Sequence, residues 1–202
     1  MERGLEKEDQ LTLKLLNTVE EKSDISQRHL ASELGIALGL TNSYINRCAR
    51  RGLIRIRGKS PRRYLYFLTP KGFAEKAKLS TRYLAKSLGF YRASADEFRT
   101  LFQKYETVKG LRVILSGLSD LAEIAILIAG AEENIEITAI YDKDSDQSIF
   151  HQIPIYSDYS TVPMCDLIIV TCMQDPVITY TELVEKQDIE NVYLPKIFGI
   201  EI

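Results

Sequence analysis

The chain has 202 residues, of which 45% are hydrophobic and 27% are charged, the composition of an ordinary water-soluble globular protein. This length fits one large domain or two small ones. No apolar run approaches the roughly 20 residues of a membrane span. The charged start, MERGLEKEDQ, does not resemble a signal peptide, so we expect a cytoplasmic protein. Three cysteines, Cys48, Cys165 and Cys172, have no metal-like spacing and predict neither a disulfide framework nor a metal site.

Charge is distributed unevenly along the chain. Residues 1–106 hold 21 Lys and Arg against 12 Asp and Glu, a net charge of +9. Residues 107–202 hold 5 against 16, a net charge of −11. This asymmetry predicts two domains with different partners.

The basic half begins with a pattern of short helices. Residues 11–22 carry apolar side chains at mostly helical spacing, and Ser26 is a candidate N-cap for a second helix that ends at Gly35. Thr41 or Asn42 can cap a third helix, over residues 41–51. Helices joined by a short turn are typical of the helix-turn-helix motif, in which the last helix enters the DNA major groove.

Two strands follow the third helix. Residues 53–57 and 64–69 read as strands and residues 58–63 as a turn, and a hairpin in this place is a wing. Nine basic residues and no acidic one lie between Glu33 and Glu75. We therefore predict binding to double-stranded DNA that weakens as salt rises. The predicted DNA contacts are Gln27, Arg28, Thr41, Asn42, Ser43, Tyr44, Asn46, Arg47, Arg50, Arg51, Arg55, Lys59, Arg62 and Arg63.

A long helical pattern runs from Pro70 to Glu106, with Thr69 as its cap and a break expected near Gly89. A helix that is apolar on one face needs a partner, so we expect a homodimer, with packing inside the chain as the alternative. Its apolar residues are Phe73, Ala77, Leu84, Leu88, Tyr91, Phe98, Leu101, Phe102 and Tyr105. The expected division is a winged helix-turn-helix domain over residues 1–69, a helical linker or dimerisation segment over 70–108, and a second domain over 109–202.

Two segments, ISQRHLASELGIALGLTNSYINRCARRGLIRI and YLYFLTPKGFAEKAKLSTRYL, carry a specific resemblance. They resemble the winged-helix regulators of the MarR type that are associated with exopolysaccharide gene clusters, over about residues 8–105. The resemblance implies a transcription regulator of surface-polysaccharide genes. Regulators of that type end near the point where the acidic half of this chain begins, so the acidic half departs from their pattern.

In the acidic half, strand patterns alternate with helix patterns. Strands are predicted over residues 111–117, 135–144, 165–172 and 191–197, a short extended piece over 153–159, and helices over 118–133 and 176–187. This alternation predicts a parallel sheet whose strands all end at one edge, where ligands bind. The predicted fold class is α/β in two domains: a winged helix-turn-helix, then a small Rossmann-like parallel sheet.

The stretch RVILSGLSDLAEIA (residues 112–125) lies where a nucleotide-binding fold carries its phosphate loop. Gly117 can supply the tight turn, but Ser119 replaces the middle glycine and narrows the space for a pyrophosphate. Asp142 follows Gly117 by 25 residues, about where an acidic residue would bind ribose hydroxyls. The alternative is that Gly117 only turns the chain and Asp142 only caps it. The candidate effector site consists of Gly117, Leu118, Ser119, Asp120, Asp142, Lys143, Thr171, Cys172 and Met173.

The acidic half resembles the small Rossmann domains of polysaccharide-biosynthesis proteins and of redox-sensing repressors, in RVILSGLSDLAEIA, ITAIYDKD, HQIPIYSD and MCDLIIVT. The first resemblance implies a nucleotide-sugar ligand and the second NAD(H), so a nucleotide-type effector is expected. We expect a regulator and not an enzyme, because His151 is the one histidine of this half and Cys172 has no evident base. Three alternatives stay open: a ligand-free interaction or dimerisation module, a nucleotide-sugar enzyme fragment, and a winged helix that contacts protein instead of DNA.

Overall fold

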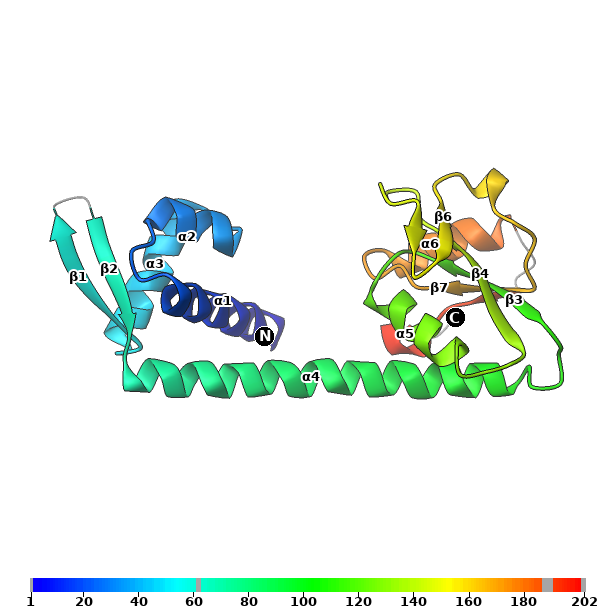
Figure 1. The fold of residues 1–202 in the computed structure, drawn as a ribbon, viewed down its shortest axis with the longest axis horizontal. Coiled ribbons are helices and arrows are strands. Elements are labelled where there is room, and N and C mark those ends of the chain that lie inside the picture. Colours follow the sequence, from blue (N-terminus) through cyan, green and yellow to red (C-terminus); the bar gives the residue numbers. More distant parts are fainter. Residues whose placement is uncertain (1, 61–62, 187–190, 201–202) are drawn as a thin grey trace. The chain divides into compact units, whose positions relative to one another are not determined.

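The computed structural model describes residues 2–60, 63–186 and 191–200. It forms two compact units, Met1–Leu88 and Gly89–Ile202 (Figure 1). The first unit is a winged helix-turn-helix and the second is built on a mixed, mainly parallel sheet, so the predicted fold class is confirmed. No helix within the described ranges is both long enough and apolar enough to cross a membrane.

The first unit packs short helices against a two-stranded antiparallel sheet. Its elements are α1 (Glu2–Glu21), α2 (Gln27–Leu34), α3 (Leu38–Arg50), β1 (Ile54–Ser60), β2 (Arg63–Leu68) and the first part of α4 (Pro70–Gln103). Leu16 of α1, Leu30 of α2, Ile45 of α3 and Tyr66 of β2 are fully buried in one core. α1, α2 and α3 thus each contribute one apolar face to the same cluster, which fixes the position of α3.

Three helix signals read from the sequence are confirmed. The Ser26 hydroxyl accepts a hydrogen bond from the backbone N–H of His29 at 3.2 Å, and Gly35 ends α2 in the left-handed conformation at φ 65°. The Thr69 hydroxyl accepts a hydrogen bond from the N–H of Gly72 at 3.0 Å, directly before Pro70 begins α4.

The predicted starts of α1 and α3 are wrong. α1 begins at Glu2, nine positions before Leu11, and α3 begins at Leu38, three positions before Thr41. Neither Thr41 nor Asn42 caps α3: the N-cap position is Ala37, and Thr41 is buried with its hydroxyl donating to the carbonyl of Ala37 at 3.1 Å. The start of α3 therefore has no side-chain cap that a sequence pattern could reveal.

The first strand of the wing is longer than predicted, and the second is shifted by one residue toward the N-terminus. β1 continues to Ser60 and β2 begins at Arg63, with Gly58 opposite Tyr64 and Ser60 opposite Arg63. The predicted turn over residues 58–63 is therefore wrong at both of its ends, because backbone pairing extends the hairpin through polar residues that suggest a turn.

α4 is one continuous helix of 34 residues, so the expected break at Gly89 is wrong. Its apolar stripe divides in two. Phe98, Leu101 and Phe102 are buried in the core of the second unit, whereas Leu84 and Leu88 are exposed. Packing inside the chain, the alternative raised above, accounts for the last part of the stripe and leaves the middle part uncovered.

The sheet of the second unit has the strand order β5-β6-β4-β3-β7-β8 within the described residues. Its elements are β3 (Leu111–Ser116), α5 (Asp120–Ala129), β4 (Ile135–Tyr141), β5 (Ile149–Phe150), β6 (Ile153–Tyr156), η1 (Tyr159–Thr161), β7 (Leu167–Val170), α6 (Pro176–Val184), β8 (Val192–Tyr193) and η3 (Lys196–Phe198). β3, β4, β6, β7 and β8 pair in parallel, as predicted. The sequence did not indicate β5, an edge strand that pairs antiparallel with β6. The two strands are connected by His151 and Gln152, both of which have a positive φ.

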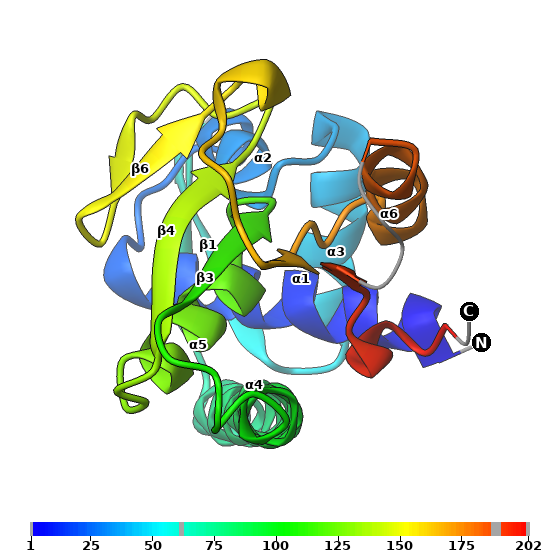
Figure 2. The same cartoon turned by 90° about the vertical axis from the view of Figure 1, so that its right-hand side faces the viewer.

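Helices cover both faces of this sheet (Figure 2). α5 and the last part of α4 pack on one face in a core that includes Val113, Leu115 and Ile140. α6 packs on the other face, where Ile114, Ile168 and Leu183 are buried. Because both faces are covered, β7 and most of β3 are buried apolar runs, and the polar residues that follow the strands gather at one edge.

Candidate nucleic-acid interface and strand-end site

α3 has a buried face and an exposed face. Thr41, Ile45 and Cys48 point into the core of the first unit. The exposed residues of the helix that were predicted to contact DNA are Asn42, Ser43, Asn46, Arg47 and Arg50. Thr41 is 0% exposed and its hydroxyl is bonded to the backbone, so this predicted contact cannot reach a base.

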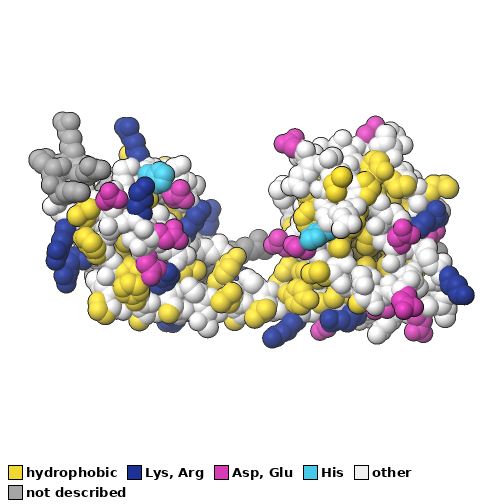
Figure 3. Space-filling model, in the orientation of Figure 1, with side chains coloured by type: hydrophobic (Ala, Val, Ile, Leu, Met, Phe, Trp, Pro, Cys, Tyr) yellow, Lys and Arg dark blue, Asp and Glu magenta, His cyan; other side chains and the backbone are white. Residues whose placement is uncertain are grey.

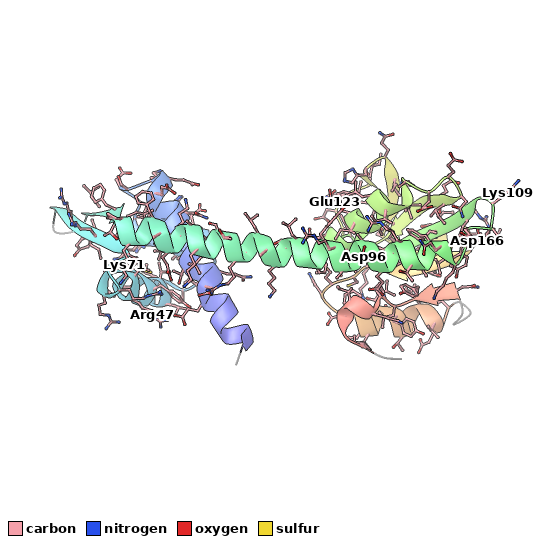
Figure 4. The ribbon with its side chains drawn as sticks, turned by 90° about the horizontal axis from the view of Figure 1, so that it is seen from below. Arg47, Lys71, Asp96, Lys109, Glu123 and Asp166 are labelled. Atoms are coloured by element: carbon pink, nitrogen blue, oxygen red, sulfur yellow. The ribbon has the colours of Figure 1, made fainter. Side chains whose placement is uncertain are left out.

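Two predicted arginine contacts already have acidic partners. Arg47 forms an ion pair with Glu8 of α1, and its guanidinium lies 5.3 Å from the centre of the half-buried Tyr44 ring (Figure 4). The hydrogen bond and the charge of Glu8 raise the pKa of Arg47. Arg51 lies 2.7 Å from the carboxylate of Glu75 on α4. Both acids lie outside the acid-free stretch of the sequence, and only the fold brings them to these arginines.

Other basic side chains of the first unit remain open to solvent. Arg28 on α2, Arg50 on α3 and Arg55 on β1 are exposed, and no ion pair involves them within the described part of the chain. Lys and Arg side chains lie along the wing edge of this unit and also on other parts of its visible face (Figure 3). Such unpaired cations are suited to phosphate groups.

Four predicted DNA contacts remain: Gln27, Lys59, Arg62 and Arg63. Gln27 is half-buried beside Tyr66. The backbones of Lys59 and Arg63 lie in the wing strands, and the structure does not describe their side chains. Arg62 lies outside the described residues.

The sequence prediction missed the first turn of α3. Leu38 and Leu40 are 44% and 48% exposed at the start of this helix. Together with Gly39 they were assigned to the turn between two helices, because glycine next to apolar residues without a capping side chain suggests a turn.

The ends of β3, β4 and β7 bring together the loop residues predicted to bind a nucleotide. The backbone N–H of Leu118 donates a hydrogen bond to Oδ2 of Asp142 at 2.7 Å. The other oxygen of Asp142 accepts a hydrogen bond from the N–H of Asp144 at 3.0 Å. The carboxylate of Asp142 therefore binds the loop amide that a phosphate would approach.

Gly117 is required by a close approach of the backbone. Its φ of 108° lies in a region that L side chains rarely adopt, and a Cβ placed there would lie 2.4 Å from both Cα and N of Cys172. The buried Thr171 hydroxyl donates to the carbonyl of Gly117 at 2.6 Å. The chain after β7 thus occupies the space next to the glycine turn.

Ser119 is the N-cap of α5. Its hydroxyl accepts from the N–H groups of Leu121 and Ala122 at 3.1 and 3.3 Å and donates to the carbonyl of Thr171 at 2.7 Å. The N–H groups of Leu121 and Ala122, which could otherwise bind an anion at the start of the helix, are therefore satisfied inside the chain.

The other predicted effector-site residues lie around this edge. Asp120 begins α5 and is exposed, Met173 is 46% exposed, and Cys172 is half-buried. The Lys143 ammonium lies 3.8 Å from the carboxylate of Glu182. The histidine of the acidic half, His151, contacts the carboxylate of Glu123 at 3.3 Å on the surface.

Comparison with known proteins identifies part of the first unit. Residues 8–55 match the family of winged helix-turn-helix DNA-binding domains. A search of curated proteins finds no match.

Several solved structures are similar at low identity. The PcaV transcriptional regulator of Streptomyces coelicolor is 23% identical over 48% of this chain and 74% of its own, with a TM-score of 0.39. FabT of Streptococcus pneumoniae, in complex with DNA, is 19% identical over 59% of this chain and 68% of its own, with a TM-score of 0.33. Human N-acetylserotonin methyltransferase, in complex with SAM, is 15% identical over 80% of this chain and 64% of its own, with a TM-score of 0.31. The family match over residues 8–55 and the described elements α1 to β1 together identify a winged helix-turn-helix.

Proposed function

We propose that this chain is a DNA-binding transcription regulator and that α3 enters the major groove. The exposed face of α3, in a domain that matches a DNA-binding family, is the observation that carries the proposal. Asn42, Asn46 and Arg50 have the side chains that read base edges: amides pair with adenine and guanidinium with guanine. Leu38 and Leu40 add apolar surface suited to thymine methyl groups.

The phosphate contacts follow from the ion pairs. Arg28 and Arg55 are exposed and unpaired among the described residues, so they can bind the DNA backbone without losing an internal partner. Arg47 must exchange Glu8 for a DNA phosphate or base before it contributes. We therefore rank Arg50 above Arg47 as a base contact.

Fluorescence anisotropy with a labelled duplex from upstream of the chain's own gene tests this proposal. We expect Arg50→Gln to weaken binding about tenfold, the typical loss for one good arginine–guanine pair. Arg99→Gln is the matched control, because Arg99 lies in the second unit, 2.8 Å from Asp96. Binding that does not weaken between two salt concentrations, or an equal loss in both variants, would contradict DNA reading by α3.

The resemblance to exopolysaccharide-associated regulators extends the proposal to the target genes. It rests on the segments around α2, α3 and the start of α4, and it suggests operators near surface-polysaccharide genes. Genome-wide mapping of bound DNA is the test. Sites that avoid such genes would reject this extension and leave DNA binding itself untouched.

We further propose a homodimer formed through the middle of α4. Leu84, Leu88 and Tyr91 are 58%, 51% and 38% exposed, and their spacing of four and three residues places them on one side of the helix. A second copy would cover this apolar row, and a two-fold dimer would present two α3 helices to a palindromic site.

Light scattering after gel filtration gives the mass that tests the dimer. Leu88→Glu adds a charge to the apolar row and is expected to yield monomers. Ala93→Glu adds the same charge to nearly the opposite side of the same helix, since each residue turns the helix by about 100°, and should leave the mass unchanged. A monomeric wild type, or equal dissociation in both variants, would reject this interface.

For the second unit, the internal hydrogen bonds favour the interaction module over the nucleotide-type effector. Asp142 and Ser119 occupy the N–H groups of Leu118, Leu121 and Ala122, and the Cys172 backbone fills the space beside Gly117. We expect NADH and UDP-glucose to leave the melting temperature unchanged. A saturable rise with either nucleotide would restore the effector hypothesis.

A further inference from the structure

A groove at the base of the wing has no role in the sequence-based prediction. Its volume is about 240 Å³, and it is lined by Arg55, Arg57, Phe67, Leu68, Thr69 and Pro70. Arg55 on β1 pairs with Phe67 on β2. Their neighbours Ile54 and Tyr66 are buried, so the groove lies on the outer face of the hairpin.

The charge of this groove is not neutralised by the chain. Arg55 and Arg57 are exposed two positions apart on the same face of β1, and no ion pair involves either within the described ranges. Arg47 and Arg51, by contrast, are paired with Glu8 and Glu75. Two neighbouring guanidinium groups without a carboxylate create a positive potential that attracts an oxyanion.

Phe67 gives the groove an apolar wall. Phe67 is 37% exposed, and the Arg57 guanidinium lies 5.8 Å from the centre of its ring. Leu68 and Pro70 add further apolar lining. The Thr69 hydroxyl is already bonded to the carbonyl of Gly52 at 2.6 Å and to the N–H of Gly72, so polar recognition falls to the two arginines.

We propose that this groove binds a small phosphate monoester with a flat apolar body, in the absence of DNA. The two guanidinium charges match the roughly −2 charge of a phosphate monoester. The apolar body stacks against Phe67, and the phosphate bonds to Arg55 and Arg57. This site goes beyond the proposed DNA binding, because it places an effector in the first unit. The bound phosphate would neutralise Arg55, which is a candidate contact to the DNA backbone.

Isothermal titration of the full chain without DNA tests the site, with phenyl phosphate, inorganic phosphate and phenol as probes. We expect one saturable site for phenyl phosphate, weaker binding of inorganic phosphate, and no binding of phenol. Arg57→Gln should weaken the binding of phenyl phosphate about tenfold or more, since hydrogen bonds between charged groups are stronger than those between neutral groups. Phe67→Ala should remove the preference for phenyl phosphate over inorganic phosphate. Arg28→Gln, which removes an exposed arginine from α2, should bind like wild type.

Two results would overturn the proposal. The first is equal weakening by Arg57→Gln and Arg28→Gln, because the anion would then respond only to total charge. The second is that phenyl phosphate does not bind to the wild type while Arg57→Gln loses affinity for DNA, because the groove would then bind DNA phosphates alone. All substituted side chains are exposed, so an unchanged melting temperature confirms that the variants fold.

Discussion

Asp142 Oδ2 lies 2.7 Å from the backbone nitrogen of Leu118, so the carboxylate after β4 accepts the hydrogen bond offered by the loop after β3. In a nucleotide-binding loop such N–H groups face a phosphate. Here the chain supplies its own anion, because Asp142, the residue predicted to bind ribose, accepts this hydrogen bond. The contact makes Asp142 a structural link between two strand ends.

Removing this carboxylate should destabilise the chain. Asp142→Ala leaves the partly buried N–H of Leu118 without an acceptor, a change that costs about 1–3 kcal/mol. Urea unfolding followed by circular dichroism measures the free energy of unfolding. Asp146→Ala, at an exposed position, is the control and should change it by less than about 0.5 kcal/mol. Equal stability of the two variants would show that the Asp142 contact does not support the fold.

Two glycine substitutions should change stability in opposite directions. Gly117→Ala places a Cβ 2.4 Å from the Cys172 backbone at a φ of 108°, and strain and overpacking together should cost about 2–5 kcal/mol. Gly89→Ala lies inside α4 with nothing within 4 Å of the new Cβ, and should stabilise by about 0.5–1 kcal/mol. Thermal unfolding of both variants provides the test. A stabilising Gly117→Ala would mean that the chain after β7 does not pack on this turn.

Glu8 should oppose DNA binding. Glu8→Gln removes the ion-pair partner of Arg47 and one negative charge beside α3, so we expect DNA affinity to rise a few-fold at low salt. Anisotropy titrations at two salt concentrations measure the effect, which should shrink as salt rises. Glu33→Gln, on α2 beside His29, is the control for the loss of one charge elsewhere in the unit. An equal rise in both variants would assign the effect to net charge alone.

Acid should weaken the link between the starts of β3 and β7. The side chain of Arg112, and then its backbone N–H, donate to Asp166 and hold the pKa of this carboxyl below its usual value. The folded pKa is lowered, so the contribution to stability is complete above the unfolded value of about 3.9 and is lost as pH falls through the folded value.

Asp166→Asn should therefore be less stable than wild type at pH 7, with a difference that narrows below about pH 4. Urea unfolding at pH 7, 4 and 3 measures this difference. Asp96→Asn removes an exposed helical ion pair and should show a small difference at every pH. A constant gap for Asp166→Asn would contradict the assigned role of its charge.

Local signals explain what could be predicted. Ser26 and Thr69 cap helices as their positions suggested, because capping depends on a side chain and an N–H three residues away. The buried strands β3 and β7 were visible as short apolar runs. The start of α3 was not visible, because no capping side chain marks it, and β5 exists only through its pairing with β6.

The sequence by itself determined the two-part organisation, the helix-turn-helix and wing, and the alternation of strands and helices, since these depend on composition and on periods of a few residues. Only the tertiary structure decided which arginines are paired with a carboxylate inside the chain and which remain free to bind DNA. Glu8 reaches Arg47 across 39 positions, and Glu75 reaches Arg51 across 24. The tertiary structure also brings the Asp142 carboxylate to the backbone N–H of Leu118, 24 positions away, because the ends of parallel strands meet at one edge of the sheet. Long-range contacts of this kind leave no periodic trace in the chain.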